Sequence, residues 1–145
     1  MHRNILKISV LFIMLISAGF VSCNREKKQI QDGTVLKEPG IPYDTGNGIS
    51  FQYTFDRVPA MGMNILKIVL LQDGNKPSGP VKITGDVGMP DMKGSHDSGE
   101  MEFRVNNRGE YLLPVNIVMP GKWHAAIRFY RDGKIIFTAF VEIDV

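Results

Sequence analysis

The chain contains very little cysteine: one residue in 145, at position 23. A chain with one cysteine cannot form an internal disulfide, even in an oxidising compartment. Sequence motifs of catalysis are missing as well. Neither His96 nor His124 lies in a Gly-x-Ser-x-Gly or His-Glu-x-x-His context, and phosphate-binding glycine loops are missing. We therefore expect a protein that is not an enzyme.

Helical periodicity and excess charge are also missing. After Gly48, short apolar runs divided by Gly, Pro, Asn and Asp replace any 3.6-residue period. The chain has 17 Lys and Arg against 15 Asp and Glu, and residues 1–22 contain Arg3 and Lys7 but no acid, which leaves 15 of each beyond them. With no basic cluster in the folded part, we expect no nucleic-acid partner.

The N-terminus, by contrast, has a distinct pattern. Arg3 and Lys7 precede an uncharged apolar run over residues 8–21, and Ser22 stands directly before Cys23. The run suits a signal-peptide core and is short for a stable membrane span. Polar residues follow at once. The arrangement resembles a bacterial lipoprotein signal, in which the cysteine is lipidated and becomes the first mature residue, although Phe20 stands where leucine is usual.

This resemblance implies a signal peptide over residues 1–22, lipidation of Cys23 and a location in the cell envelope, on the periplasmic or another extracytoplasmic face. Two or more acyl chains hold a protein durably on a membrane, because each buried methylene contributes about 0.8 kcal/mol. Two alternatives stay open. An uncleaved N-terminal anchor helix would also keep the domain on a membrane, and ordinary cleavage after Gly19 would release it.

The remainder divides into a polar segment and one domain. Residues 23–47 show no lasting apolar period and contain several breakers, namely Gly33, Pro39, Gly40, Pro42 and Gly46. We predict a flexible tether there. Residues 48–145 are about 100 residues long, the commonest size of a single domain.

Seven strands are predicted in this domain. They cover residues 49–55, 64–71, 81–87, 100–105, 110–118, 122–130 and 135–145. Trp123, Ala125, Ile127 and Phe129 alternate and are expected to face the core, and Pro114 places its strand at an edge or a bulge. Short strands with turns at this spacing predict an all-β, immunoglobulin-like antiparallel β-sandwich. A small closed barrel is the alternative.

Methionine is the residue type that indicates a site. If successive strands run antiparallel, the first, third and fifth connections lie at one end of the sandwich. Those connections hold or border Met61, Met63, Met89, Met92, His96 and Met119. Thioether and imidazole donors favour Cu(I) over hard cations. These six residues are the candidate ligands, whereas Met101, which alternates with Phe103 and Val105, is expected in the core.

A packing role accounts for the same methionines. Methionine is a flexible side chain that fills gaps, and Met89 and Met119 are each followed by proline at a strand end. They would then plug the end of the sandwich, and His96 would be solvated in its Gly-rich loop. The sequence leaves the metal site and the plug both open.

Short motifs run through the predicted domain in a fixed order. They are Gly62-Met63-Asn64, Asp73-Gly74, Lys76-Pro77-Ser78-Gly79, Met89-Pro90-Asp91-Met92, Gly109-Glu110-Tyr111 and Met119-Pro120-Gly121-Lys122-Trp123. This series resembles the YtkA-like domain family, which is related to FixH, over roughly residues 48–145. The resemblance implies a small all-β domain on the outer side of a membrane. It also implies a loose association with copper handling, metal efflux and cytochrome oxidase assembly.

Two functions are therefore expected. The first is a lipid-anchored, non-enzymatic binding module that holds or passes Cu(I), with a copper-efflux or oxidase-assembly component as its envelope partner. The second is a metal-free immunoglobulin-like module whose edge strands or loops bind an envelope protein.

Overall fold

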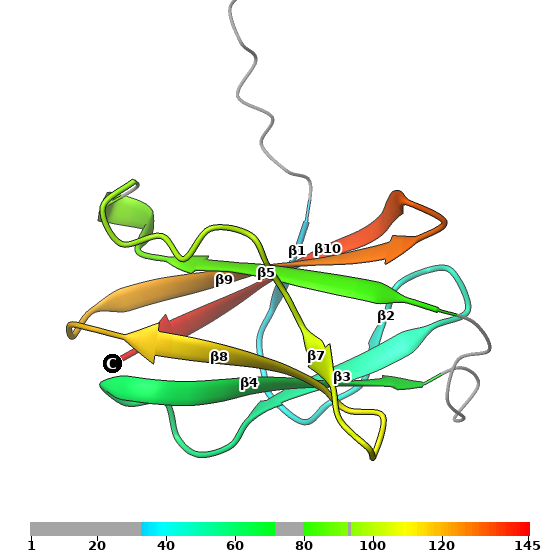
Figure 1. The fold of residues 1–145 in the computed structure, drawn as a ribbon, viewed down its shortest axis with the longest axis horizontal. Coiled ribbons are helices and arrows are strands. Elements are labelled where there is room, and N and C mark those ends of the chain that lie inside the picture. The colour runs from blue at the N-terminus through cyan, green and yellow to red at the C-terminus, as the bar shows by residue number, and fades with distance from the viewer. Residues whose placement is uncertain (1–32, 72–79, 93) are drawn as a thin grey trace, which may run out of the picture.

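Two β-sheets packed face to face form the molecule (Figure 1). The computed structural model describes residues 33–71, 80–92 and 94–145. One sheet has the strand order β1-β10-β9-β5-β6 and the other β2-β3-β4-β8-β7. The elements are β1 (Thr34–Leu36), β2 (Tyr43–Asp44), β3 (Ser50–Phe55), β4 (Gly62–Leu71), β5 (Lys82–Gly88), η1 (Pro90–Met92), β6 (Met101–Glu102), β7 (Arg104–Val105), β8 (Tyr111–Ile117), β9 (Lys122–Arg131) and β10 (Lys134–Asp144).

This architecture confirms the predicted β-sandwich, and the closed barrel is wrong because the strands form two separate sheets. The predicted signal peptide, Cys23 and the motifs within residues 72–79 lie outside the described residues. None of the described segments is a helix of the length and apolarity that crossing a membrane requires.

The N-terminal part of the fold was not expected. Residues 34–44 were predicted as tether, but β1 pairs in parallel with β10 and β2 pairs with β3. Leu36 is buried in the core. The Tyr43 hydroxyl accepts hydrogen bonds from the Lys37 and Glu38 amides and donates one to the Glu38 carbonyl. These strands are too short to show alternation, and they gain their order from strands distant in sequence.

A second difference concerns residues 100–105, which were predicted as one strand. The chain passes from one sheet to the other at buried Phe103, so β6 pairs with β5 while β7 pairs with β8. Because the crossing ends the alternation, Met101 is half-buried and Val105 is exposed. The prediction that Val105 shares the core face with Phe103 is wrong.

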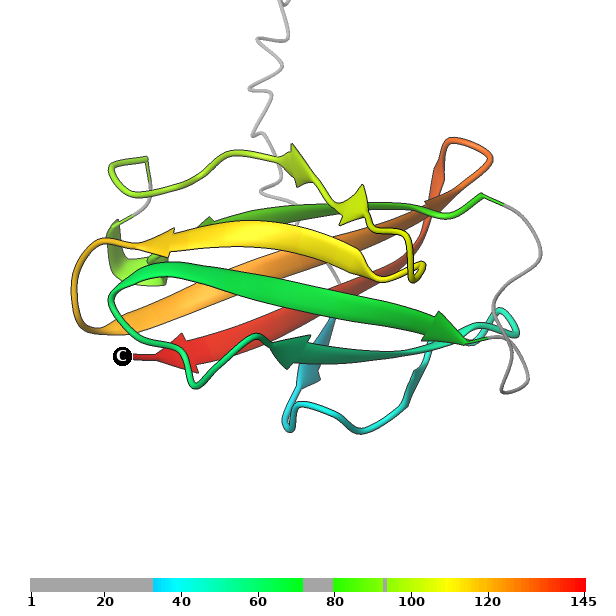
Figure 2. The same cartoon turned by 60° about the horizontal axis from the view of Figure 1, so that its bottom comes forward.

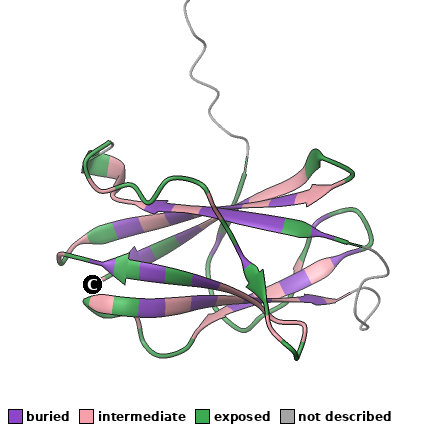
Figure 3. Ribbon diagram, in the orientation of Figure 1, coloured by how far each residue is buried: buried purple, intermediate pink, exposed green. Residues whose placement is uncertain are grey.

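The core lies between the sheets, where long strands such as β4, β8 and β9 turn alternate residues inward (Figure 3). In β9, Trp123, Ala125, Ile127 and Phe129 are all buried, as the sequence predicts. Phe129 packs against Phe51 from the opposite sheet, with ring centroids 4.6 Å apart and ring planes tilted by 43°. Burial of these apolar faces is the main force that holds the two sheets together.

The connections that carry methionine gather at one end of the sandwich (Figures 1 and 2). We call this the methionine end, made of residues 56–63, 88–92, 94–100 and 118–121. It follows from the antiparallel pairing of β3 with β4, β5 with β6 and β9, and β4 with β8. The prediction that strand direction alone brings these connections together is confirmed.

Candidate functional site

One cavity of about 420 Å³ lies at the methionine end. It is bounded on one side by β8 and on the other by the segment that follows η1. Two methionines and a histidine line it: Met63 from the start of β4, His96 from the segment after η1, and Met101 from β6. Three separate elements therefore contribute two methionines and one histidine to the lining of one cavity.

Asn64 fixes the loop that leads into β4 and Met63. The Asn64 side chain is fully buried, and its amide nitrogen donates to the carbonyls of Ala60 at 2.7 Å and Gly62 at 2.9 Å. The Ala60 amide donates back to Asn64 Oδ1. Since neighbouring residues of a strand point to opposite faces, the inward Asn64 turns Met63 outward, where it is 54% exposed.

The segment around His96 is held by its neighbours. Asp97 Oδ2 accepts a hydrogen bond from the Gly94 amide at 2.8 Å, and Ser98 exchanges two hydrogen bonds with the backbone of Val87. Gly88 leaves room for Asp97, because an added Cβ would overlap the Asp97 carboxylate and lie 3.2 Å from its Cα. His96, which is half-buried, is thereby placed at the cavity.

Trp123 lines the inner side of the cavity. It is 2% exposed, and its indole N–H donates to the Met119 carbonyl at 3.1 Å. The turn that holds Met119 is fixed further by hydrogen bonds between the backbones of Gly121 and Val145. The cavity therefore has an ordered apolar base.

The six candidate ligands do not all reach this cavity. Met63 and His96 line it. Met61 and Met92 lie at the same end and are exposed, but neither lines it. Met89 and Met119 are half-buried and pack against the core, which is the arrangement that a plug requires.

Met101 was missed as a site residue. Its alternation with Phe103 predicts a core position, and Met101 does pack against the core, as Met89 and Met119 do. It also lines the cavity next to the crossing between the sheets, and that crossing has no local sequence signal. Within the described residues, no three His, Cys, Asp or Glu side chains are grouped so that they could hold a metal ion. The potential donors among the residues that line the cavity are the thioethers of Met63 and Met101, the imidazole of His96 and the oxygen-bearing side chains of Asp97, Ser98 and Asn116.

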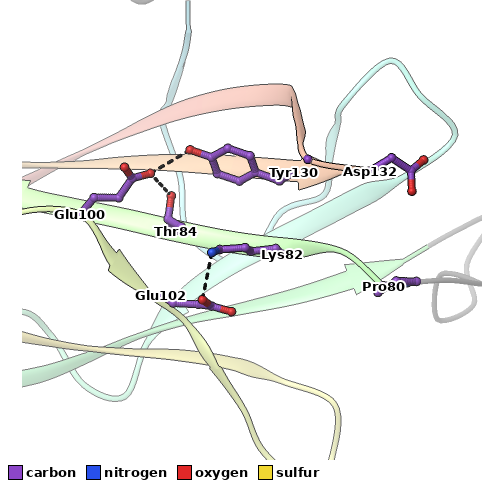
Figure 4. Close-up of a pocket in the computed structure, with 8 residues that line it drawn as sticks. Pro80, Lys82, Thr84, Glu100, Glu102, Tyr130 and Asp132 are labelled. Carbon is purple, nitrogen blue, oxygen red and sulfur yellow. Dashed lines mark hydrogen bonds and ion pairs between the residues drawn. The ribbon is translucent and has the colours of Figure 1, made fainter.

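A polar network surrounds Glu100, the residue before Met101 (Figure 4). Glu100 Oε1 accepts hydrogen bonds from Thr84 Oγ1 at 2.6 Å and from the Tyr130 hydroxyl at 2.8 Å, and Arg128 lies 3.6 Å away. The hydrogen bonds from Thr84 and Tyr130 lower the pKa of the Glu100 carboxyl. Lys82 pairs with Glu102 beside it. The network attaches the short strand β6 to β5 and β9.

The fold and the cavity together define a small all-β sandwich domain with a cavity of about 420 Å³ at one end. We call this cavity the groove from here on. A family model described as YtkA-like matches residues 43–128, more than half of the chain. The chain therefore belongs to the YtkA-like family, as its motifs predicted. The match begins at β2, which also places the start of the domain before residue 48. Neither the curated proteins nor the solved structures contain a match.

Proposed function

We propose that this protein is a non-enzymatic, lipid-anchored module of the cell envelope that binds Cu(I) in the groove of Met63, His96 and Met101. The observation that carries the proposal is that two methionines and one histidine, from three separate elements, line one cavity. Sulfur ligands select Cu(I), and hard cations prefer oxygen. Lipidation of Cys23 would remove the only thiol of the chain from competition for the ion.

The arrangement suits holding and passing an ion. Met63 is more than half exposed, so a bound ion would remain accessible from solvent. Trp123 and Val87 line the inner side of the cavity and are buried, so they would shield the ion from the interior face. A copper-efflux or oxidase-assembly component of the envelope is the kind of partner that such a module would serve.

The test is a Cu(I) titration of the detergent-extracted protein under reducing, oxygen-free conditions, against a coloured Cu(I) chelator. We expect binding of one ion, and weakening by about tenfold or more in each of Met63→Leu, His96→Gln and Met101→Leu. Zn(II) and Mg(II) should not compete. A Cys23→Ala chain titrated in parallel shows whether the thiol contributes. If the wild type binds no Cu(I), or if all three variants bind as well as it does, the proposal is wrong.

A metal-free interaction module is the second candidate. The observation that favours it is the apolar surface at the methionine end, where Val58, Met61 and Val118 are 86%, 57% and 51% exposed. Apolar side chains that are exposed at one end of a domain offer a contact surface to a partner protein. This candidate predicts that partner binding does not change when Cu(I) is added or removed.

A further inference from the structure

The methionines at the methionine end fall into two groups by exposure. Met61, Met63 and Met92 are 57%, 54% and 40% exposed, whereas Met89 and Met119 are half-buried and pack against the core. A thioether that solvent reaches is open to oxidation to the sulfoxide, which is polar and which reductases can reverse. Of the three exposed side chains, Met63 is the one that lines the groove. An oxidant from solvent would therefore reach a residue of the proposed copper site directly.

The backbone of Met63 is fixed independently of its side chain. The Arg57 guanidinium donates a hydrogen bond to the Met63 carbonyl, and the Asn64 amide closes the loop just before β4. Met63 also lies opposite Asn116 in the ladder between β4 and β8. Because none of these contacts uses the Met63 thioether, a sulfoxide on this exposed side chain would leave the strand in place. Oxidation here would change a donor without unfolding the domain.

Oxidation would also reverse the preference of this donor for a soft ion. The thioether sulfur of Met63 is a soft donor, the kind that selects Cu(I). A sulfoxide presents an oxygen atom to an ion, and oxygen donors suit hard cations such as Mg(II). The groove would then keep the half-buried Met101 and His96 but lose its exposed thioether. Weaker retention of Cu(I) follows from the loss of that donor.

We infer that Met63 is a reversible oxidation site and that formation of its sulfoxide releases Cu(I) from the groove. This inference rests on the proposed function, because it regulates the ion bound there. The oxidant is hydrogen peroxide. One S–O bond forms as the O–O bond of the peroxide breaks, and the other oxygen leaves as water with both peroxide protons. The sulfur gives up two electrons, which the peroxide takes up. A thiol-dependent sulfoxide reductase reverses the step, with a disulfide and water as the other products.

The first experiment maps oxidation by peptide mass spectrometry of the detergent-extracted protein treated with hydrogen peroxide, with and without Ag(I). Silver is the probe because it is a soft monovalent ion that peroxide does not oxidise. Met61, which is 57% exposed against 54% for Met63, is the matched control. Without the ion, both should oxidise at similar rates. With free Ag(I) at about ten times its Kd, Met63 should react about tenfold more slowly and Met61 as before. If silver protects neither residue, or both equally, the assignment to Met63 is overturned.

The second experiment repeats the Cu(I) titration on protein that has been oxidised and then freed of peroxide. We expect the affinity to fall by about tenfold or more, and the two sulfoxide reductases, one for each epimer, to restore it. Met61→Leu should respond to peroxide as the wild type does, whereas Met63→Leu should show no further loss. The melting temperature of the oxidised protein should stay close to that of the reduced protein. A clear fall would mean that oxidation unfolds the domain and would overturn the inference.

The outcomes separate the two proposals. Absence of Cu(I) binding by the reduced protein overturns the proposed function, and this inference with it. Cu(I) binding that peroxide leaves unchanged, or weakens equally in Met63→Leu and the wild type, overturns this inference alone. A loss of affinity that the reductases reverse and that Met63→Leu no longer shows supports both.

Discussion

Asn64 and Ala60 pair through two hydrogen bonds, one in each direction, at 2.7 and 3.1 Å. The side-chain amide of Asn64 thus makes the two hydrogen bonds that the backbone of a neighbouring strand would otherwise make, and it closes the loop between β3 and β4. Asn64 is completely buried, so its hydrogen bonds cannot be replaced by water without opening the end of the sandwich. The loop closed in this way carries Met61 and presents Met63 to the groove.

The first prediction concerns this residue. Asn64→Ala should lower the free energy of unfolding by about 2–3 kcal/mol, because it removes buried hydrogen bonds and leaves a small void. It should also weaken Cu(I) binding through displacement of Met63. Asn116, which lies opposite Met63 in the ladder, is exposed, and Asn116→Ala should change the stability by less than about 0.5 kcal/mol. Urea unfolding of both variants gives the comparison, and equal losses would contradict the role of Asn64.

The second prediction concerns Trp123, which is buried and hydrogen-bonded to Met119. Trp123→Ala should cost about 3–5 kcal/mol, enough to unfold a marginally stable domain. Trp123→Phe keeps much of the apolar volume and should cost clearly less. The fluorescence maximum of the native protein, which has one tryptophan, should lie at short wavelength. A maximum typical of solvated indole would contradict the burial of this side chain.

The third prediction is a pH dependence set by Glu100. Its pKa in the fold is below the ordinary value of 4.5, so the ionised form stabilises the fold at every pH above that value. This contribution is lost as the pH falls from 4.5 through the lowered pKa. The melting temperature of the wild type should therefore approach that of Glu100→Gln in this acidic range and exceed it by a constant amount at higher pH.

Thr84 provides the control for this pH dependence, because its hydrogen bond is the largest cause of the lowered pKa. In a Thr84→Val background, the difference in melting temperature between Glu100 and its glutamine variant should depend less on pH. An unchanged dependence would show that the network does not govern the titration.

The fourth prediction separates the methionines that pack from those that bind. Met89 and Met119 pack against the core, and Met89→Leu and Met119→Leu should each cost less than about 1.5 kcal/mol because the volumes are similar. Both variants should retain the Cu(I) affinity of the wild type, in contrast to Met63→Leu and Met101→Leu. A loss of Cu(I) affinity on changing Met89 or Met119 would show that the ion lies nearer to these two residues than to the groove.

The fifth prediction concerns the anchor. Cys23 follows the apolar run of residues 8–21, and Cys23→Ala should block lipidation and leave the precursor unprocessed or the domain misplaced. Mass spectrometry of the membrane fraction measures both outcomes. An identical mature mass and equal membrane association in the variant would mean that Cys23 is not the point of attachment.

The sequence alone predicted a strand and its buried face correctly where the strand is long and has one face in the core. The alternation of Trp123, Ala125, Ile127 and Phe129 predicted β9 and its buried face correctly, because side chains on a strand alternate with a period of two. Strand direction alone then placed the methionine connections at one end, since each antiparallel step returns the chain to the opposite end of the sheet.

The tertiary structure decided everything that depends on contact between distant segments. β1 and β2 are strands only because β10 and β3 offer them backbone partners, and no local pattern in so few residues indicates such pairing. The crossing at Phe103 likewise ends an alternation that the sequence continues without a break. It leaves Met101 packed against the core, as predicted, and at the same time lining the groove with Met63 and His96. The sequence determined which donor types reach the methionine end, and only the packing of one sheet on the other decided which of them share a cavity.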